Sequence, residues 1–318
     1  MIIEVAVEQL PDRYSKDLIQ YRKCKDVTQL TCYHRMQEFG NKGYPYWKDL
    51  TKDDIKKDIL NFIRLYKKIK LEGWKEEPYL KGEIFEDGSW KIKSGYHRIS
   101  ILKYLKYKTV KVDWTMHPEF EKFYNVVNRR YKKNRMYQNI SHIIFSNWSC
   151  VRGKNRWALI NQNIPSRSKI LDIGSYLGDI SLNLGIKRHS VRGIEADSNL
   201  VWASNYLVKS HQNRSNRVLK VEFINMNIIN YFQNNQDKYN VIIMLSVDRW
   251  IRDNYGKGAL IKLFQDIAKR CNIFIFESRG KHEKIGLRLL KKHTGFKNIQ
   301  LLGKDDGETH RNLWKLWK

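Results

Sequence analysis

The chain has 318 residues, enough for about two domains of ordinary size. Hydrophobic residues make up 42% and aromatic residues 13% of it, so it can build packed cores, and a globally disordered chain is excluded. It holds 60 Lys and Arg against 33 Asp and Glu, a net charge of +27. No apolar run approaches the roughly 20 residues of a membrane span, and residues 1–8 lack the pattern of a signal peptide. We therefore expect a soluble, cytoplasmic protein.

The positive charge allows two interpretations. A basic surface attracts phosphates and binds nucleic acid. Alternatively, abundant Lys and Asn reflect AT-rich codons, and the charge is spread over both halves of the chain. The four cysteines are scattered without a C-x-x-C pair: Cys24, Cys32, Cys150 and Cys271. They predict reduced thiols, with neither a metal site nor a disulfide framework.

The first block of the chain is predicted to mix helices and strands. A helix over 53–71 begins with carboxylates and places six apolar residues on one face: Ile55, Ile59, Phe62, Ile63, Tyr66 and Ile69. The later elements of this block, in chain order, are a hairpin (82–86 and 90–93), a helix opening with Ser94-Gly95-Tyr96-His97-Arg98 and a strand (109–112).

A basic segment, 116–160, follows and is predicted to be partly helical. It contains the run 129–133 and, just before the next block, Arg152 and Arg156. These two arginines are candidates for clamping an anionic acceptor. The alternative is that they are solvated.

The rest of the chain alternates strands with helices. The predicted strands are 169–173, 190–195, 221–224, 239–245, 271–277, 298–302 and 312–317. Such alternation is typical of a parallel sheet with helices on both faces, here closed by an antiparallel final hairpin. The fold class is therefore α/β, a Rossmann-like, mostly parallel seven-stranded sheet with a smaller N-terminal α+β domain.

The first of these strands runs into a glycine-bearing turn, Asp172-Ile173-Gly174-Ser175-Tyr176-Leu177-Gly178. Gly174 permits a tight turn, and Gly178 permits the close approach of a ligand. The next strand ends at Glu195, about 20 residues later, where a carboxylate can accept hydrogen bonds from the vicinal hydroxyls of a ribose.

This block resembles the class I S-adenosyl-L-methionine (SAM)-dependent methyltransferases, whose loop has the form D-x-G-x-x-x-G. A nicotinamide-binding Rossmann domain is the alternative, and it fits the glycine pattern less well. The resemblance implies SAM as cofactor. The implied cofactor-binding residues are Asp172, Gly174 and Gly178 around the methionine, Glu195 at the ribose, Asn227 near the adenine, where the family often has Asp, and Ser246 beside the transferred methyl group.

The sequence after the fourth strand of this block bears on the reaction. It reads Leu245-Ser246-Val247-Asp248-Arg249-Trp250-Ile251 and lacks the proline turn that the superfamily uses to methylate base amino groups. It is similar to enzymes that methylate oxygen on RNA phosphate ends, and also to methyltransferases of sugars or small molecules. We predict O-methylation of a phosphate-bearing or nucleic-acid acceptor. The alternatives are a sugar hydroxyl of a glycan, a small metabolite, or an inactive nucleic-acid-binding regulator.

Three side chains near this turn are further candidates. Asp248 is the candidate catalytic base facing the acceptor, or else a helix N-cap. Trp250 stacks on an acceptor ring or packs in the core. Glu277, which closes the fifth strand, is expected as a carboxylate at the rim of the site.

The N-terminal block, 1–115, resembles the ParB/sulfiredoxin-like domain through its helix, hairpin and G-x-H-R motif. His97 and Arg98 at a helix N-terminus predict a phosphate site. Tyr96 stands where sulfiredoxins carry the reactive Cys, which argues against sulfinic-acid repair. The alternative is a purely structural domain. The predicted domains are thus 1–115, a connector 116–160, and a methyltransferase domain 161–318.

Overall fold

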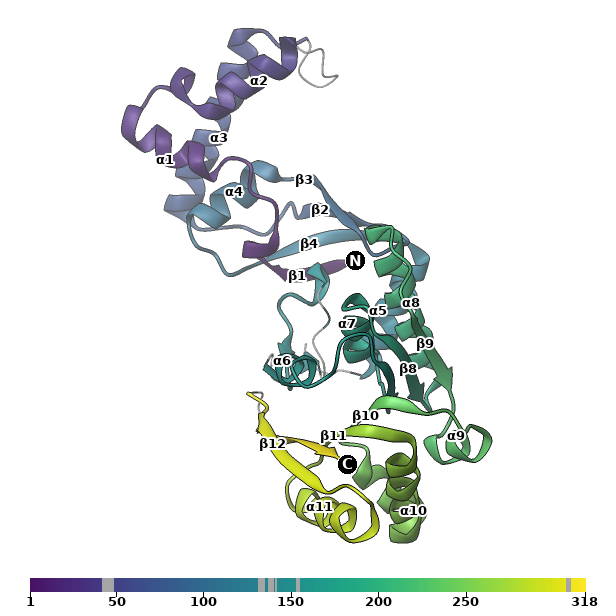
Figure 1. Cartoon of the computed structure of the whole chain (residues 1–318). Coiled ribbons are helices and arrows are strands. Elements are labelled where there is room, and N and C mark those ends of the chain that lie inside the picture. Colours follow the sequence, from purple (N-terminus) through teal and green to yellow (C-terminus); the bar gives the residue numbers. More distant parts are fainter. Residues whose placement is uncertain (42–48, 131–134, 137–139, 141, 153–154, 307–309) are drawn as a thin grey trace. The chain divides into compact units, whose positions relative to one another are not determined.

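The computed structural model describes residues 1–41, 49–130, 135–136, 140, 142–152, 155–306 and 310–318 (Figure 1). It divides into two compact units, each with its own sheet. Unit 1 comprises residues 1–118 with 141–147, and unit 2 comprises 119–140 with 148–318. The predicted connector is thus divided between the units, and residues 131–133 of its basic run lie outside the described residues.

Unit 1 is built around the long helix α3 (Lys52–Glu72). Thr51 and Asp54 form a reciprocal capping box at its start, which satisfies two backbone N–H groups. The six apolar residues that the sequence placed on one face of this helix are all buried. They pack against α1 (Ser15–Cys24), α2 (Thr31–Asn41) and α4 (Tyr96–Tyr104) through residues such as Leu18, Met36 and Ile101.

The sheet of unit 1 has the strand order β1-β4-β2-β3. Its strands are β1 (Ile2–Ala6), β2 (Leu80–Ile84), β3 (Trp90–Ser94) and β4 (Thr109–Met116). The β2–β3 hairpin turns at Asp87, whose carboxylate accepts hydrogen bonds from the backbone and hydroxyl of Ser89. The described part of unit 1 also has short 3-10 turns at Val7–Gln9, Val27–Gln29 and Ile143–Phe145.

Unit 2 contains a seven-stranded sheet within the described residues, in the order β12-β13-β11-β10-β7-β8-β9. Its strands are β7 (Lys169–Ile173), β8 (Ser190–Glu195), β9 (Val221–Asn225), β10 (Tyr239–Leu245), β11 (Cys271–Glu277), β12 (Asn298–Lys304) and β13 (Asn312–Trp317). The first five strands are parallel, and β13 pairs antiparallel with both β11 and β12. This confirms the predicted mostly parallel, Rossmann-like sheet with its final hairpin.

Helices cover both faces of this sheet, and consecutive residues of its central strands are accordingly buried. On β10, Ile242 and Met244 join a core with Phe264 of α10, whereas Val241 and Ile243 join a separate core on the other face. The helices of unit 2 are α5 (Pro118–Arg130), α6 (Asn155–Asn161), α7 (Asp179–Ile186), α8 (Ser198–Ser215), α9 (Ile228–Asn234), α10 (Asp248–Arg270) and α11 (Lys281–His293). The two-residue strands β5 (Arg135–Met136) and β6 (Ser149–Cys150) form a small separate pair.

None of the helices in the described residues combines the length and the apolar composition that crossing a bilayer requires.

Candidate functional site

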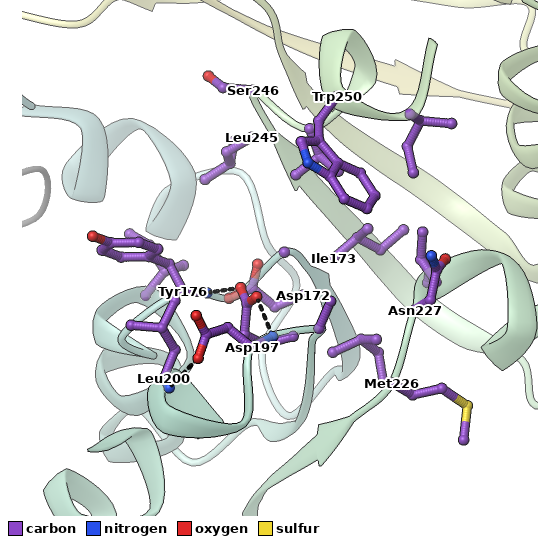
Figure 2. A pocket seen from close by; sticks show the side chains of 18 residues that line it. Asp172, Ile173, Tyr176, Asp197, Leu200, Met226, Asn227, Leu245, Ser246 and Trp250 are labelled. Carbon is purple, nitrogen blue, oxygen red and sulfur yellow. Dashed lines mark hydrogen bonds between the residues drawn. The ribbon is translucent and has the colours of Figure 1, made fainter. Parts of the chain in front are cut away.

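A cavity of about 750 Å³ lies at the carboxyl ends of β7, β8, β9 and β10. Strands β8 and β9 lie on one side of β7 and β10 and β11 on the other, so the cavity sits where the strand order reverses. Open α/β sheets bind ligands at this point, and the volume suits a small molecule. Figure 2 shows Ser246 and Leu245 toward one end, Asn227 and Met226 toward the other, and the Trp250 indole between them.

The two glycines of the first turn have different surroundings. Gly174 lines the cavity with a φ of +69°, and a Cβ there would lie 2.5 Å from Val247 Cγ2. Gly178, with a φ of +72°, is the N-cap of α7, and a Cβ there would lie 2.4 Å from the ring of Phe223. Gly178 is therefore packed against protein and is not a lining residue, in contrast to the expectation that a ligand approaches it.

Glu195 lines the cavity at the end of β8 with its carboxylate held in place. Its Oε2 accepts a hydrogen bond from the backbone N–H of Tyr176, and its Oε1 accepts one from that of Asp197, both at 3.0 Å. Figure 2 draws both bonds. An ionised carboxylate has about four lone-pair sites, so the two oxygens retain capacity for hydroxyl donors.

Asp172 also lines the cavity and is buried near the end of β7. The Ser181 hydroxyl donates to its Oδ2 at 2.7 Å. Burial raises the pKa of Asp172 to about 6, and burial raises the pKa of nearby Asp179 to about 7, against the opposing influence of Arg156. Two carboxyl groups next to the glycine turn thus change protonation state close to neutral pH.

The far end of the cavity is formed by the segment after β9. Asn227 Oδ1 accepts from the backbone N–H of Ile229 and so caps α9, while its Nδ2 donates to the Tyr255 hydroxyl at 2.5 Å. The Tyr255 ring lies 5.6 Å from that of Trp250, centroid to centroid. Trp250 lines the cavity with 47% of its surface exposed, so the core-packing alternative for this residue is wrong.

Ser246 lines the other end of the cavity in a left-handed backbone conformation, with a φ of +66°. Its hydroxyl donates to Glu277 Oε1 at 2.5 Å and accepts from Arg152 Nη2 at 3.4 Å and from Arg311 Nη1. Arg156 Nε lies 2.9 Å from Glu277 Oε2. Three charged side chains therefore contact one serine hydroxyl, and a fourth, Arg156, pairs with Glu277.

These charged residues differ from the expectations for them. Arg152 and Arg156 are 4% and 3% exposed and pair with Glu277, so they are neither solvated nor placed at the surface as a clamp. Glu277 is fully buried and is not at the rim. Arg311 was not anticipated, because the β12–β13 hairpin brings it to Ser246 from 65 residues further along the chain.

Asp248 does not face the cavity. It is 2% exposed, and the Ser278 hydroxyl donates to its Oδ2 at 2.6 Å. The N-cap of α10 is Val247, without a side-chain cap bond, and burial raises the pKa of Asp248. The expectation that this carboxylate faces the acceptor is wrong, because as the first residue of α10 it points toward the turn after β11.

In unit 1, His97 and Arg98 are engaged by the protein itself. The His97 ring packs between Tyr14 and Phe62, with centroids 4.8 and 4.9 Å away, and burial lowers its pKa. Arg98 Nη1 donates to the backbone carbonyl oxygen of Pro78. Neither side chain lines the cavity of unit 2.

No protein-family model matches the chain, and no curated protein matches it. A solved structure of the bifunctional kinase-methyltransferase WbdD is 19% identical, with a TM-score of 0.51, covering 61% of this chain and 46% of that one. The chain thus spans less than half the length of that protein. Magnesium protoporphyrin IX methyltransferase from Synechocystis (15% identical, 51% and 75% covered) and the N-methyltransferase NodS from Bradyrhizobium japonicum (11% identical, 52% and 86% covered) match with TM-scores of 0.40 and 0.42. The likeness to WbdD shows a methyltransferase fold.

Proposed function

We propose that this protein is a SAM-dependent methyltransferase acting on oxygen. The observation that carries the proposal is the charge of the cavity lining. Among its described residues are three carboxylates, Asp172, Glu195 and Asp197, and no Lys, Arg or His. Such a lining suits a cation bearing a sulfonium and an ammonium group. It does not suit the pyrophosphate of a dinucleotide, which requires positive partners.

Several residues at the cavity then have roles in holding the cofactor, which supplies a methyl group activated on a sulfonium. Glu195, whose carboxylate is oriented by two backbone N–H groups, accepts hydrogen bonds from the ribose hydroxyls. Asp172 and the Gly174 turn receive the methionine part, and Asn227 lies at the adenine. Gly178 supports the turn from behind through its contact with Phe223.

At the end of the cavity opposite Asn227, Ser246 marks where the acceptor meets the methyl group. The chain's task in such a transfer is alignment and the exclusion of water. We propose an acceptor that bears phosphate, such as a nucleic acid. Three arginines pair with Glu277, which accepts from the Ser246 hydroxyl, and the chain has no proline turn at this position.

We further propose that unit 1 is a ParB/sulfiredoxin-like accessory domain. Its G-x-H-R motif opens α4 after the β2–β3 hairpin, as the resemblance implies. The contacts of His97 with two aromatic rings and of Arg98 with a backbone carbonyl favour a structural role over phosphate binding.

Calorimetric titration of the full chain with SAM, S-adenosylhomocysteine and NAD tests the proposal. We expect the first two to bind and NAD not to bind. Glu195→Gln should weaken SAM binding about tenfold or more, because a charged hydrogen-bond acceptor is lost. Glu222→Gln on β9 is the matched control, since that exposed carboxylate pairs with Arg192 away from the cavity. Absence of SAM binding, or equal effects of the two substitutions, would contradict the proposal.

A further inference from the structure

The arginines behind Ser246 come from separate parts of the chain. Arg152 precedes α6, Arg156 lies in it, and Arg311 precedes β13. All are at least nine-tenths buried, with 4%, 3% and 9% exposed. A guanidinium remains charged in proteins. A buried ion pair is weak evidence for stability, because apolar residues of similar size often stabilise a fold equally well. The burial of these three arginines therefore requires an explanation other than a contribution to stability.

Two carboxylates are in direct contact with these guanidinium groups in the described part of the chain. Glu277 contacts all three guanidinium groups, and Asp305 lies 3.4 Å from Arg152. Asp172 and Asp179 also interact with Arg156, yet burial still raises their pKa values to about 6 and 7. At pH 7 Asp179 is therefore partly protonated, whereas Asp172 is mostly ionised.

Arg156 has donor capacity left over. Its Nη2 and Nε are buried and have no hydrogen-bond partner among the described residues, and Nε forms an ion pair with Glu277 Oε2 at 2.9 Å. A buried polar group without a partner carries a desolvation penalty. A ligand oxygen at this place would remove that penalty.

Among the described residues that line the Ser246 end of the cavity, none is a carboxylate or an imidazole that could take a proton. The other lining residues there are Leu245, Val247 and Trp250. Asp248 points to Ser278 and does not line the cavity. Glu277 is fully buried and does not line the cavity either: its Oε1 accepts from the Ser246 hydroxyl, and its Oε2 forms an ion pair with Arg156 but has no hydrogen-bond partner among the described residues. A neutral hydroxyl acceptor has to lose a proton as it is methylated, and general-base catalysis needs a base within hydrogen-bond reach.

We propose, on the basis of the function proposed above, that the acceptor oxygen belongs to a phosphate group held at Ser246 by Arg156 and Arg311. A phosphate oxygen forms the new C–O bond with the methyl carbon, and the electron pair of the broken C–S bond stays on sulfur. The negative oxygen and the positive sulfonium both become neutral, and no proton is removed. Guanidinium groups from two separate segments, one with Arg152 and Arg156 and one with Arg311, suit a tetrahedral, multiply charged anion better than a planar carboxylate.

The test uses the full chain saturated with S-adenosylhomocysteine and titrated with inorganic phosphate or acetate. We expect phosphate to bind more tightly than acetate. Arg156→Gln and Arg311→Gln should each weaken phosphate binding about tenfold. Arg249→Gln is the control, because Arg249 is exposed and pairs with Asp253 in α10. Equal phosphate affinity in all variants would overturn the proposal.

Two further measurements distinguish an unfolded variant and a wrong acceptor from a wrong proposed function. Thermal unfolding checks each variant, and Arg156→Lys, which keeps the charge, should retain part of the affinity if a Gln variant unfolds. Incubation with SAM and phenyl phosphate or methyl glucoside, followed by NMR of the products, identifies the methylated oxygen. A phosphate methyl ester supports the proposal, and a methylated sugar hydroxyl overturns it. Failure to bind S-adenosylhomocysteine would instead contradict the proposed function itself.

Discussion

Two glycine turns in this molecule are built alike and serve different ends. Gly95 precedes α4 in unit 1 and Gly178 precedes α7 in unit 2, and each is a left-handed N-cap without a side-chain cap bond. Around the second turn, Gly174 and its neighbours open onto a cavity lined by carboxylates. Around the first, His97 and Arg98 are occupied by aromatic rings and a backbone carbonyl.

The sheets explain the difference. The turn after β7 lies beside the carboxyl ends of two parallel neighbours, β8 and β10, which bring Glu195 and Ser246 to the same edge. The turn after β3 follows an edge strand whose neighbour is antiparallel, with Ser94 paired to Lys81 near the start of β2. A glycine turn before a helix therefore indicates a ligand site only when neighbouring strands end beside it with polar side chains.

The largest expected effect comes from replacing one glycine of each turn by alanine, and it tests this comparison directly. A Cβ at Gly174 would lie 2.5 Å from Val247 Cγ2, and one at Gly95 would lie 2.3 Å from Leu80 Cδ2, both at positive φ. Left-handed strain and overpacking should together lower the free energy of unfolding by about 2–4 kcal/mol in either variant. Only Gly174→Ala should also weaken SAM binding. Thermal unfolding and calorimetric titration measure the two effects, and a similar loss of SAM affinity in Gly95→Ala would break the comparison.

The buried carboxyl group of Asp172 in the cavity of unit 2 should lower the free energy of unfolding by an amount that depends on pH. The pKa of Asp172 is about 6 in the folded state, against 3.8 for the ordinary group. The native state therefore binds more protons than the unfolded state between these values, and stability falls as pH rises from about 4 to about 6.

Asp172→Asn should remove this cost while keeping an oxygen for the Ser181 hydroxyl. We expect a gain of about 2 kcal/mol in the free energy of unfolding at pH 7.5. The gain should vanish below pH 4, where both states are protonated. Denaturant unfolding at both pH values measures it. A gain of equal size at both would show that the charge of Asp172 is not its source.

In unit 1, the side chain of His97 should contribute to packing alone and not to ligand binding. Burial lowers its pKa, so the folded state favours the neutral ring, and stability is lost as pH falls below the ordinary value of 6.5. His97→Phe should keep the contacts with Tyr14 and Phe62 and remove this acid sensitivity, while His97→Ala should cost about 1–2 kcal/mol. Unfolding at pH 5 and pH 7.5 distinguishes them. A change in SAM affinity in either variant would refute a purely structural role.

Much of unit 2 was predictable because its strands are short apolar runs bounded by polar turns. All seven were placed to within two residues, and the turn from Asp172 to Gly178 and the acid at Glu195 were found with them. Helices α1 and α2 were missed because few apolar residues mark their faces. The group around Ser246 could not be predicted, since it depends on the register that places Leu245 opposite Glu277 and on the hairpin that delivers Arg311.

Substitutions of Trp250 should have the smallest of these effects. They test whether this ring contacts the cofactor or the acceptor. Its indole lines the cavity beside Tyr255, whose hydroxyl is held by Asn227. If Trp250 stacks on the adenine, Trp250→Ala should weaken SAM binding about tenfold, and Trp250→Phe should restore most of the affinity. Tyr255→Phe keeps the ring contact and loses only the hydroxyl bond, so its effect should be about threefold. Trp202→Ala is the control, because Trp202 stacks on Tyr206 outside the cavity. Unchanged SAM affinity in Trp250→Ala together with weaker binding of an acceptor would place this ring at the acceptor instead.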